Sequence, residues 1–277
     1  MALKIKRNKS IGVFDSGFGG LSILKGIVRE LPQYDYIYLG DTARTPYGDK
    51  KQEIIYEFTK QAVDFLFKQN CEIIILACNT ASSKALRKIQ QDYIPKKYPG
   101  KRVLGVLIPG TEESVLKTKN NRIGVIATEA TVSSKAFIRE FKKIDSKIKI
   151  YQKACPLLVS IVEAGQEDEI SSELIIKGYL NYFVNKNIDT LLLGCTHYGI
   201  LEEKINKSMP YKVEIISGGE VVGKKLKDYL SKHLDFEKKL SKQRKKIFHS
   251  TDITERFEKL GSKFFGQKIK VKKAKLI

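Results

Sequence analysis

Short apolar runs alternate along the chain with amphipathic stretches, and this alternation indicates the fold. The runs are rich in aliphatic residues and are bounded by polar residues or glycine, which is typical of buried parallel strands. The stretches between them repeat their apolar residues at helical spacing, as over residues 51–68, 167–184 and 220–233. Strands are expected over residues 11–14, 36–39, 73–76, 103–107, 123–127, 147–151, 190–193, 213–216, 246–250 and 268–271. The pattern predicts an α/β protein with mainly parallel sheets flanked by helices.

Two segments of the chain recur at nearly the same distance. Residues 11–16 (IGVFDS) are echoed by residues 123–128 (IGVIAT), which begin 112 positions later (123 − 11). The run IIILACNT at 73–80 is echoed by TLLLGCTH at 190–197, and their cysteines lie 117 positions apart (195 − 78). A chain of 277 residues is long enough for two lobes. We therefore expect two lobes of like topology, one carrying Cys78 and the other Cys195.

The two cysteine segments share a design that suggests chemistry. In each, an aliphatic run is followed by a small residue, a cysteine and hydrogen-bonding side chains that can begin a helix. Such a cysteine lies at the carboxyl end of a strand, where open α/β sheets bind ligands. The amino end of a helix also favours a thiolate. A single cysteine in this setting is more often a small buried hydrophobe, but a matched pair favours a site.

Composition narrows the class of protein without selecting a function. The first ten residues are basic but no apolar signal core follows them, and no run approaches the length of a membrane span, which favours a cytoplasmic protein. The four cysteines form no C-x-x-C pair and the histidines complete no zinc spacing, so free thiols and no metal site are expected.

The formal net charge of +20 has two explanations. It can mark a surface for nucleic acid or an anionic membrane, or it can reflect a lysine-rich composition spread over solvated faces. The lysines are scattered through nearly every expected helix and are not interleaved with aromatic residues, which favours the second explanation. A positive field would still attract a small dianion.

Two loops carry further candidate residues. The glycine-rich turn at 15–21 lacks the spacing of a phosphate cradle, and Asp15 would repel a phosphate, so we expect it to aim Asp15 and Ser16 into a cleft. The loop at 40–48 has no apolar periodicity, and Pro46 and Gly48 shape it around Tyr47. Glu163, at the end of an apolar stretch, fits a site acid and an ordinary helix-end carboxylate equally well.

If both cysteines face one cleft, the natural chemistry is proton transfer at a stereocentre. One thiolate removes a proton from one face of a small molecule, and the opposite thiol delivers a proton to the other face. Asp15 is placed to assist Cys78, and His197 is placed to assist Cys195. Charge on the intermediate would be stabilised by polar donors, which we expect to be Ser16, Asn79, Thr80 and Thr196.

Two other classes of function compete with proton transfer. Covalent catalysis by Cys195 and His197 would need only one of the two cysteines. A binding role for nucleic acid or protein is prompted only by the charge.

Taken together, the motifs resemble the cofactor-independent aspartate/glutamate racemase superfamily and, within it, the glutamate racemases. They occur in the expected order over about residues 10 to 275, as GVFDSGFGGL at 12–21, YLGDTARTPYG at 38–48, ACNTAS at 77–82, GVIATEAT at 124–131 and LGCTHY at 193–198. The resemblance implies Cys78 and Cys195 as the acid–base pair, supported by Asp15 and His197. It also implies substrate contacts from Asp15, Ser16, Tyr47, Gly48, Asn79, Thr80, Thr196 and His197, with Pro46 and Glu163 as further candidates.

The resemblance also implies an overall organisation and a role. It implies a first lobe of residues 1–104 plus 218–277, a second lobe of residues 105–217, and a site between them. It implies interconversion of L- and D-glutamate without a cofactor, D-glutamate supply for peptidoglycan, and a homodimer. Aspartate stays open as the alternative substrate, and an interaction with DNA gyrase is open but unsupported. The chain departs from the usual pattern at Ile108, Ala127, Ser160 and Gly199, which bears on the cleft wall more than on the reaction.

Overall fold

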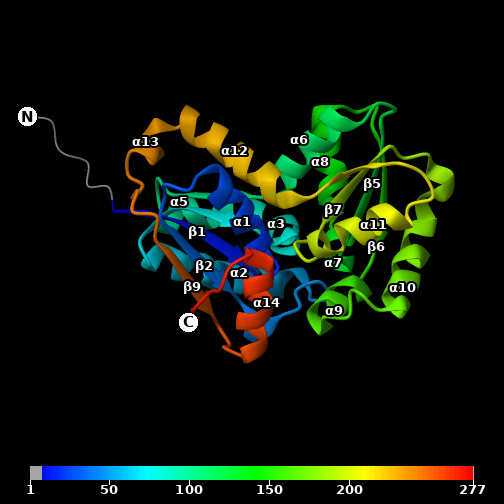
Figure 1. Ribbon diagram of the computed structural model, residues 1–277. Helices are drawn as coiled ribbons and strands as arrows, with labels where there is room; N and C mark the ends of the chain where they lie inside the picture. Colours follow the sequence, from blue (N-terminus) through cyan, green and yellow to red (C-terminus); the bar gives the residue numbers. More distant parts are fainter. Residues whose placement is uncertain (1–7, 277) are drawn as a thin grey trace, which may run out of the picture.

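The computed structural model describes residues 8–276 and contains two parallel β-sheets (Figure 1). The first sheet has the strand order β10-β9-β2-β1-β3-β4 and the second has the order β6-β5-β7-β8. Every strand pairing within these sheets is parallel. The strands are β1 (Ser10–Asp15), β2 (Tyr36–Gly40), β3 (Cys71–Leu76), β4 (Arg102–Gly105), β5 (Arg122–Ala127), β6 (Lys149–Ala154), β7 (Thr190–Gly194), β8 (Glu214–Ile216), β9 (Lys246–Ser250) and β10 (Val271–Lys273).

The repeat in the sequence corresponds to a repeat in topology. The order β2-β1-β3-β4 in the first sheet matches the order β6-β5-β7-β8 in the second. The echoed segments occupy equivalent strands, because β1 corresponds to β5 and β3 to β7. Cys78 follows β3 and Cys195 follows β7, so the two thiols hold equivalent places. The chain end adds β9 and β10 to the edge of the first sheet.

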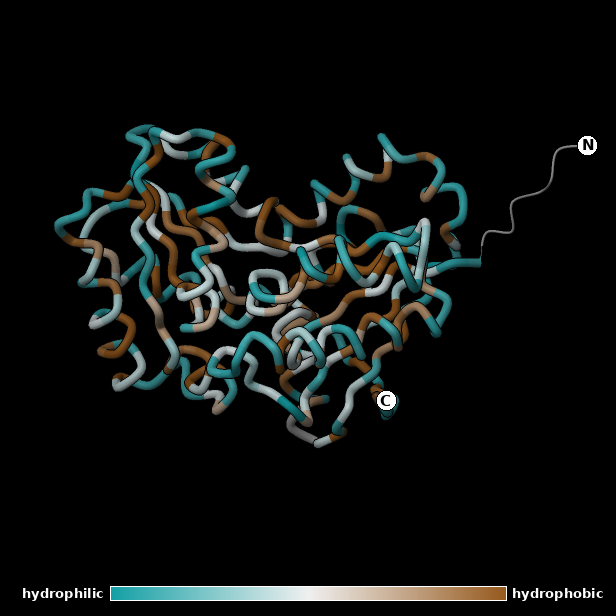
Figure 2. Tube along the Cα trace, turned by 180° about the vertical axis from the view of Figure 1, so that it is seen from behind, coloured by the Kyte–Doolittle hydropathy of each residue, from teal (hydrophilic) through white to brown (hydrophobic). Residues whose placement is uncertain are grey.

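Helices cover both faces of each sheet. Along β1, Ile11 and Val13 join the apolar cluster that contains the residues of α1, whereas Phe14 joins the cluster of α2 on the opposite face. Figure 2 shows the apolar strands enclosed between more polar outer segments. The helices are α1 (Gly20–Glu30), α2 (Gln52–Lys68), α3 (Asn79–Lys84), α4 (Leu86–Lys88), α5 (Ile94–Lys97), α6 (Leu107–Lys117), α7 (Glu129–Ser133), α8 (Ala136–Ile144), α9 (Leu157–Ala164), α10 (Ile170–Leu180), α11 (Glu202–Ser208), α12 (Gly218–Lys232), α13 (Leu234–Glu237) and α14 (Glu255–Phe265).

The two sheets are joined by shared packing as well as by the chain. One apolar cluster contains Val13 of β1 together with Ile126 of β5 and Leu193 of β7. After β8 the chain returns to the first lobe through α12, which packs against α1. The two helices cross so closely that a Cβ added to Gly26 would lie 2.1 Å from the carbonyl oxygen of Gly219. Helix α12 thus packs tightly inside the first lobe against α1, and it also contacts α6, which follows β4.

Several expected elements differ from the observed ones, among them the following. The strand expected at 103–107 ends at Gly105 because α6 begins at Leu107, and Pro109 lies in its first turn, where its missing N–H is tolerated. The helix expected over 167–184 starts only at Ile170 and gives way after Leu180 to 3-10 turns. The last strand is displaced from 268–271 to Val271–Lys273.

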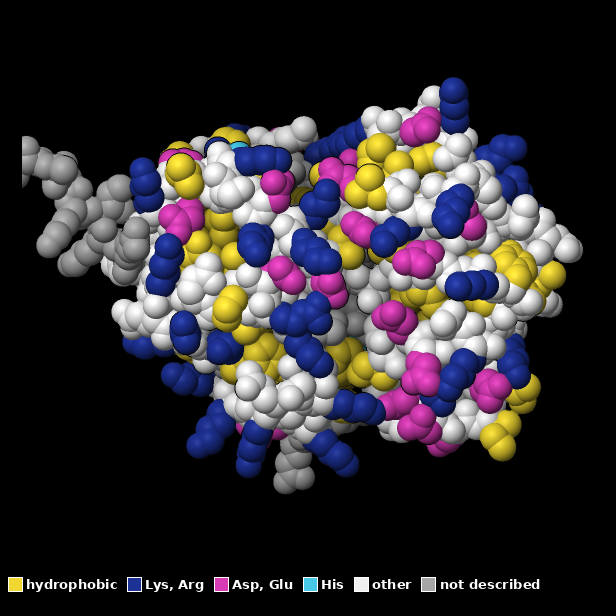
Figure 3. All heavy atoms as spheres, turned by 45° about the horizontal axis from the view of Figure 1, so that its top comes forward, with side chains coloured by type: hydrophobic (Ala, Val, Ile, Leu, Met, Phe, Trp, Pro, Cys, Tyr) yellow, Lys and Arg dark blue, Asp and Glu magenta, His cyan; other side chains and the backbone are white. Residues whose placement is uncertain are grey.

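The outer surface carries the excess of positive charge. Figure 3 shows lysines and arginines spread over both lobes of one face, with carboxylates between them. This spread agrees with a lysine-rich composition on solvated faces. Within residues 8–276, no helix is long and apolar enough to cross a membrane.

Candidate active site

A cavity of about 300 Å³ lies between the lobes, at the carboxyl ends of strands from both sheets. It contains both thiols and most of the predicted site. The wall includes Ser16, Pro46, Tyr47, Gly48, Cys78, Asn79, Thr80, Glu163, Cys195, Thr196 and His197, together with Thr45, Asp49, Thr128, Glu129, Pro156, Leu157, Val159 and Ser160. We call this space the interlobe cavity.

Cys78 lies at the junction of β3 and α3 and begins that helix. Its Sγ accepts a hydrogen bond from the Ala81 amide at 3.4 Å and lies 3.4 Å from the Ser16 hydroxyl oxygen. Burial, together with the negative charge of Asp15, raises the pKa of Cys78 to about 12, although these two hydrogen bonds oppose the rise. Cys78 is therefore a thiol at neutral pH.

Cys195 has a different environment. It is half-buried, and its Sγ lies 3.8 Å from Nδ1 of His197. The other ring nitrogen of His197 lies 3.2 Å from Oε1 of Glu163 on α9. Burial lowers the pKa of His197, but contacts with Cys195 and Glu163 and the charge of Asp15 outweigh it and raise the pKa to about 10. A cationic ring therefore stands beside Cys195.

Asp15 does not line the cavity, contrary to the expectation that it points into the cleft. Its side chain is fully buried behind the wall. One carboxylate oxygen accepts from the Gly17 amide at 3.0 Å, and the other accepts from the Thr196 hydroxyl at 3.3 Å. Burial raises the pKa of Asp15, while the charge of His197 opposes the rise. Asp15 thus reaches the site through Thr196, His197 and the electrostatic field at Cys78.

Threonine hydroxyls link the lobes beside Cys78. Thr80 Oγ1 lies 2.9 Å from Thr128 Oγ1, and Thr128 Oγ1 donates to Thr131 Oγ1 at 3.0 Å. Thr128 was not among the predicted site residues. The internal repeat contains the signal for it, because Thr128 is the counterpart of Ser16 at the offset of 112.

The loop after β2 lines the cavity with residues 45–49, Tyr47 among them. Tyr47 is buried, and its hydroxyl donates to the Asp41 carboxylate, which also accepts from Arg44 at 2.8 Å. The Gly48 carbonyl accepts from the Ala130 amide at 2.9 Å and so ties this loop to the second lobe.

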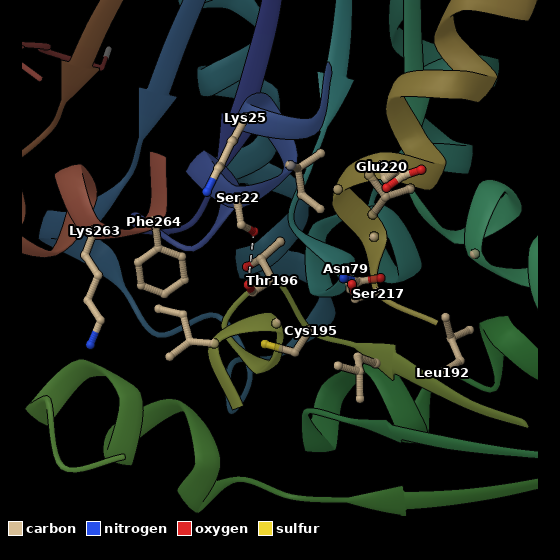
Figure 4. A pocket seen from close by; sticks show the side chains of 18 of the residues that line it. Ser22, Lys25, Asn79, Leu192, Cys195, Thr196, Ser217, Glu220, Lys263 and Phe264 are labelled. Carbon is tan, nitrogen blue, oxygen red and sulfur yellow. Dashed lines mark hydrogen bonds between the residues drawn. The ribbon is translucent and has the colours of Figure 1, made fainter. Parts of the chain in front are cut away.

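A second cavity, of about 240 Å³, borders the turn that carries Cys195 and Thr196 (Figure 4). It shares Asn79, Cys195 and Thr196 with the interlobe cavity. Residues of α1, α6, α8, β7, α12 and α14 also line it, among them Lys25 and Lys263. The departures from the family pattern are dispersed. Ser160 lines the interlobe cavity, Gly199 lines the second cavity, and Ile108 lines a third hollow beside α6 and α8.

All four cysteines are free thiols. Across the described range, 8–276, no three or more histidine, cysteine or acidic side chains form a group that could hold a metal ion. The site thus consists of two sulfurs, one imidazole, carboxylates and small polar donors.

The fold and this arrangement match a known class of enzyme. The chain belongs to the Asp/Glu/Hydantoin racemase family, whose sequence profile matches residues 11–225. It is 42% identical over 268 residues to a protein from Persephonella marina named glutamate racemase, and the match covers 96% of this chain and 97% of that one. The resemblance indicated by the motifs is therefore confirmed.

Solved structures agree with this assignment. A glutamate racemase from Francisella tularensis, solved in complex with D-glutamate, matches with a TM-score of 0.87 at 36% identity and covers 97% of this chain and 98% of that one. A glutamate racemase isoform from Bacillus anthracis matches with a TM-score of 0.89 at 32% identity, covering 98% of both chains. The predicted α/β fold with two lobes is confirmed.

Proposed function

We propose that the chain is a glutamate racemase that interconverts L- and D-glutamate by two-base proton transfer at the α-carbon, without a cofactor. The observation that carries the proposal is the cavity shared by Cys78 and Cys195, which come from equivalent strand ends of the two lobes. The Francisella tularensis relative, described in complex with D-glutamate, supports the choice of substrate.

The proposal gives the two sulfurs opposite roles in each direction of the reaction. Cys78 is a thiol, because burial raises its pKa to about 12. Cys195 lies beside His197, with 3.8 Å between its Sγ and the Nδ1 of the ring. In one direction the Cys195 thiolate takes the α-proton, and the Cys78 thiol gives its proton to the opposite face of the carbanion. The product leaves Cys195 as thiol and Cys78 as thiolate, which is the starting state for the other enantiomer.

Charge that develops on the substrate carboxylate needs donors that are already in place. Asn79, Thr80 and Thr196 are all at least nine-tenths buried and line the cavity, as does Ser16. Buried donors in a water-poor cavity stabilise such charge more strongly than water does. Acid–base catalysis contributes roughly 10²–10⁴-fold, so these groups must supply much of the remaining acceleration.

We extend the proposal to the organisation and role of the chain. Residues 1–104 with 218–277 form one functional lobe and residues 105–217 the other, and the enzyme works in the cytoplasm as a homodimer. Its D-glutamate would feed peptidoglycan synthesis and so cell-wall biogenesis and cell shape. These statements are supported by the family resemblance.

Optical rotation tests the proposal directly. L-Glutamate incubated with the protein alone should lose its rotation, and L-aspartate serves as the comparison substrate. Cys78→Ser and Cys195→Ser should each reduce racemisation by at least about 10²-fold. Cys71→Ser is the matched control for Cys78→Ser, since Cys71 is also buried but begins β3 outside the cavity. Full turnover by Cys78→Ser would instead favour covalent catalysis by Cys195 and His197.

A further inference from the structure

Helix α14 belongs to the first lobe by its position but reaches the second lobe with its last turn. Its body packs on α1, and Phe265 packs on Phe248 of β9 at a ring-centroid distance of 5.2 Å. The two preceding residues, Lys263 and Phe264, face the other way. Figure 4 shows both projecting from α14 toward the second lobe.

Phe264 is buried against the imidazole of His197. The ring centroids are 5.7 Å apart with an interplanar angle of 76°. Phe18 contacts the same imidazole at 5.4 Å and also contacts Phe264 at 5.4 Å. Edge-on ring contacts of this kind have a preferred geometry. Two aromatic rings from the first lobe thus restrict the rotation of a histidine that belongs to the second lobe.

Lys263 pairs with a carboxylate in the segment that follows α9. Its ammonium group pairs with the carboxylate of Glu167, which is only 5% exposed. Glu167 follows α9, the helix whose Glu163 lies 3.2 Å from His197 Nε2. Of two consecutive residues of α14, Phe264 therefore contacts His197 directly, and Lys263 pairs with Glu167, four positions beyond Glu163.

We infer that Lys263 and Phe264 are positioning residues that hold His197 and Glu163 in register with Cys195. The inference rests on the proposed function, in which Cys195 is one of the two bases. Neither residue touches the reacting atoms, since both act through the imidazole and its carboxylate. Errors on the order of 1 Å in such a geometry can cost 10²-fold in rate.

The charge environment of His197 provides a readout that a merely structural role would not move. The titratable groups that act on it are Cys195 on its own turn, Glu163 on α9 and Asp15 on β1. Among the described side chains of α14, the ring of Phe264 contacts the imidazole, and Lys263 pairs with Glu167. If the imidazole rotates away from Cys195 and Glu163, its pKa falls from about 10 toward its ordinary value of 6.5.

The test compares Phe264→Leu with Phe265→Leu and Lys263→Met with Lys259→Met. Each pair removes the same group from the same helix, since Phe265 is also buried but packs on β9, and Lys259 is exposed. The first measurement is the NMR titration of imidazole nitrogens in histidine-labelled protein, assigned by His197→Asn. We expect the His197 pKa to fall in Phe264→Leu and Lys263→Met and to stay unchanged in both controls.

The second measurement is the isotope effect on kcat/KM with α-deuterated L- and D-glutamate. Because the two enantiomers are equally stable, kcat/KM must change equally in both directions, so a defect confined to Cys195 is visible in isotope effects. We expect the effect to rise for one enantiomer and fall for the other in Phe264→Leu, in the same sense as in His197→Asn, with kcat/KM lowered roughly tenfold.

The outcomes separate the two proposals. Equal isotope effects for both enantiomers with an unshifted His197 titration would overturn the positioning role. An inactive wild-type protein would overturn the proposed function, and the titration would still decide whether α14 positions His197. If Phe264→Leu fails to fold, the same measurements are made on Lys263→Met, because the Lys263 side chain is half-exposed.

Discussion

Replacing Glu163 by glutamine removes the negative charge that lies beside His197, while the side chain of residue 163 keeps its shape. The wild-type pKa of His197 is about 10, against an ordinary value of 6.5, and it is raised despite complete burial. Contacts with Cys195 and Glu163 and the charge of Asp15 share this rise. The Glu163→Gln variant therefore tests one named contributor.

The expected magnitude follows from the distance. Opposite charges separated by 3.2 Å attract by about 1.3 kcal/mol in a water-like dielectric, which corresponds to about one pKa unit, and by more where water is excluded. Since Cys195 and Asp15 remain in the variant, the loss is smaller than the whole rise. We expect the pKa of His197 to fall by roughly one to two units, to about 8–9.

The assay is the pH profile of kcat/KM, whose alkaline limb reports the essential acid of the free enzyme. A raised pKa keeps the imidazole protonated up to about pH 10, so activity that needs the cation persists until then and is lost as pH rises further. In Glu163→Gln the loss should begin at about pH 8–9. The control is Glu173→Gln, which makes the same charge change at a half-exposed side chain on α10. An alkaline limb that stays in place would refute the role of Glu163.

Two further predictions concern packing and stability. Gly19→Ala would place a Cβ 2.6 Å from Thr196 Oγ1 and 2.7 Å from His197 Nδ1, so we expect a loss of about 1–3 kcal/mol in chemical denaturation together with reduced racemisation; unchanged turnover would contradict the close contact. Glu72→Gln leaves two lysines without their buried carboxylate partner, and we expect it to cost about 1–3 kcal/mol at neutral pH. Burial raises the pKa of Glu72, but the lysine hydrogen bonds outweigh it and lower the pKa below 4.5, so this stability is present above pH 4.5 and lost as the pH falls. Chemical denaturation should show that the difference in stability between wild type and Glu72→Gln is present at neutral pH and disappears at acidic pH. A difference that is the same at both pH values would exclude this linkage.

Local signals in the sequence were sufficient to predict the main architecture and both sulfurs. The apolar runs at 73–76 and 190–193 predicted β3 and β7, and the cysteines after them lie in one cavity. The repeat at an offset of 112 predicted two sheets of like order. These features are encoded over a few adjacent residues, where periodicity and end signals are strong.

Features that depend on long-range packing could not be predicted in the same way. Asp15 was expected in the cleft but is buried behind it, because Thr196, 181 positions away, closes over its carboxylate. Phe264 gave no sequence signal beyond an apolar position in a helix, yet it contacts His197 in the other lobe. The strand expected at 103–107 ends at Gly105, and α6 begins at Leu107. Such contacts are set by how the lobes meet.

The central claim is that two sulfurs on opposite faces of one amino acid exchange protons with it. The most direct measurement follows L-glutamate in D₂O by mass spectrometry at low conversion, with substrate and product separated. Two-base transfer predicts that the D-glutamate formed carries solvent deuterium at the α-carbon while the recovered L-glutamate carries almost none. Equal labelling of the recovered L-glutamate and the product would indicate a single base and contradict the claim.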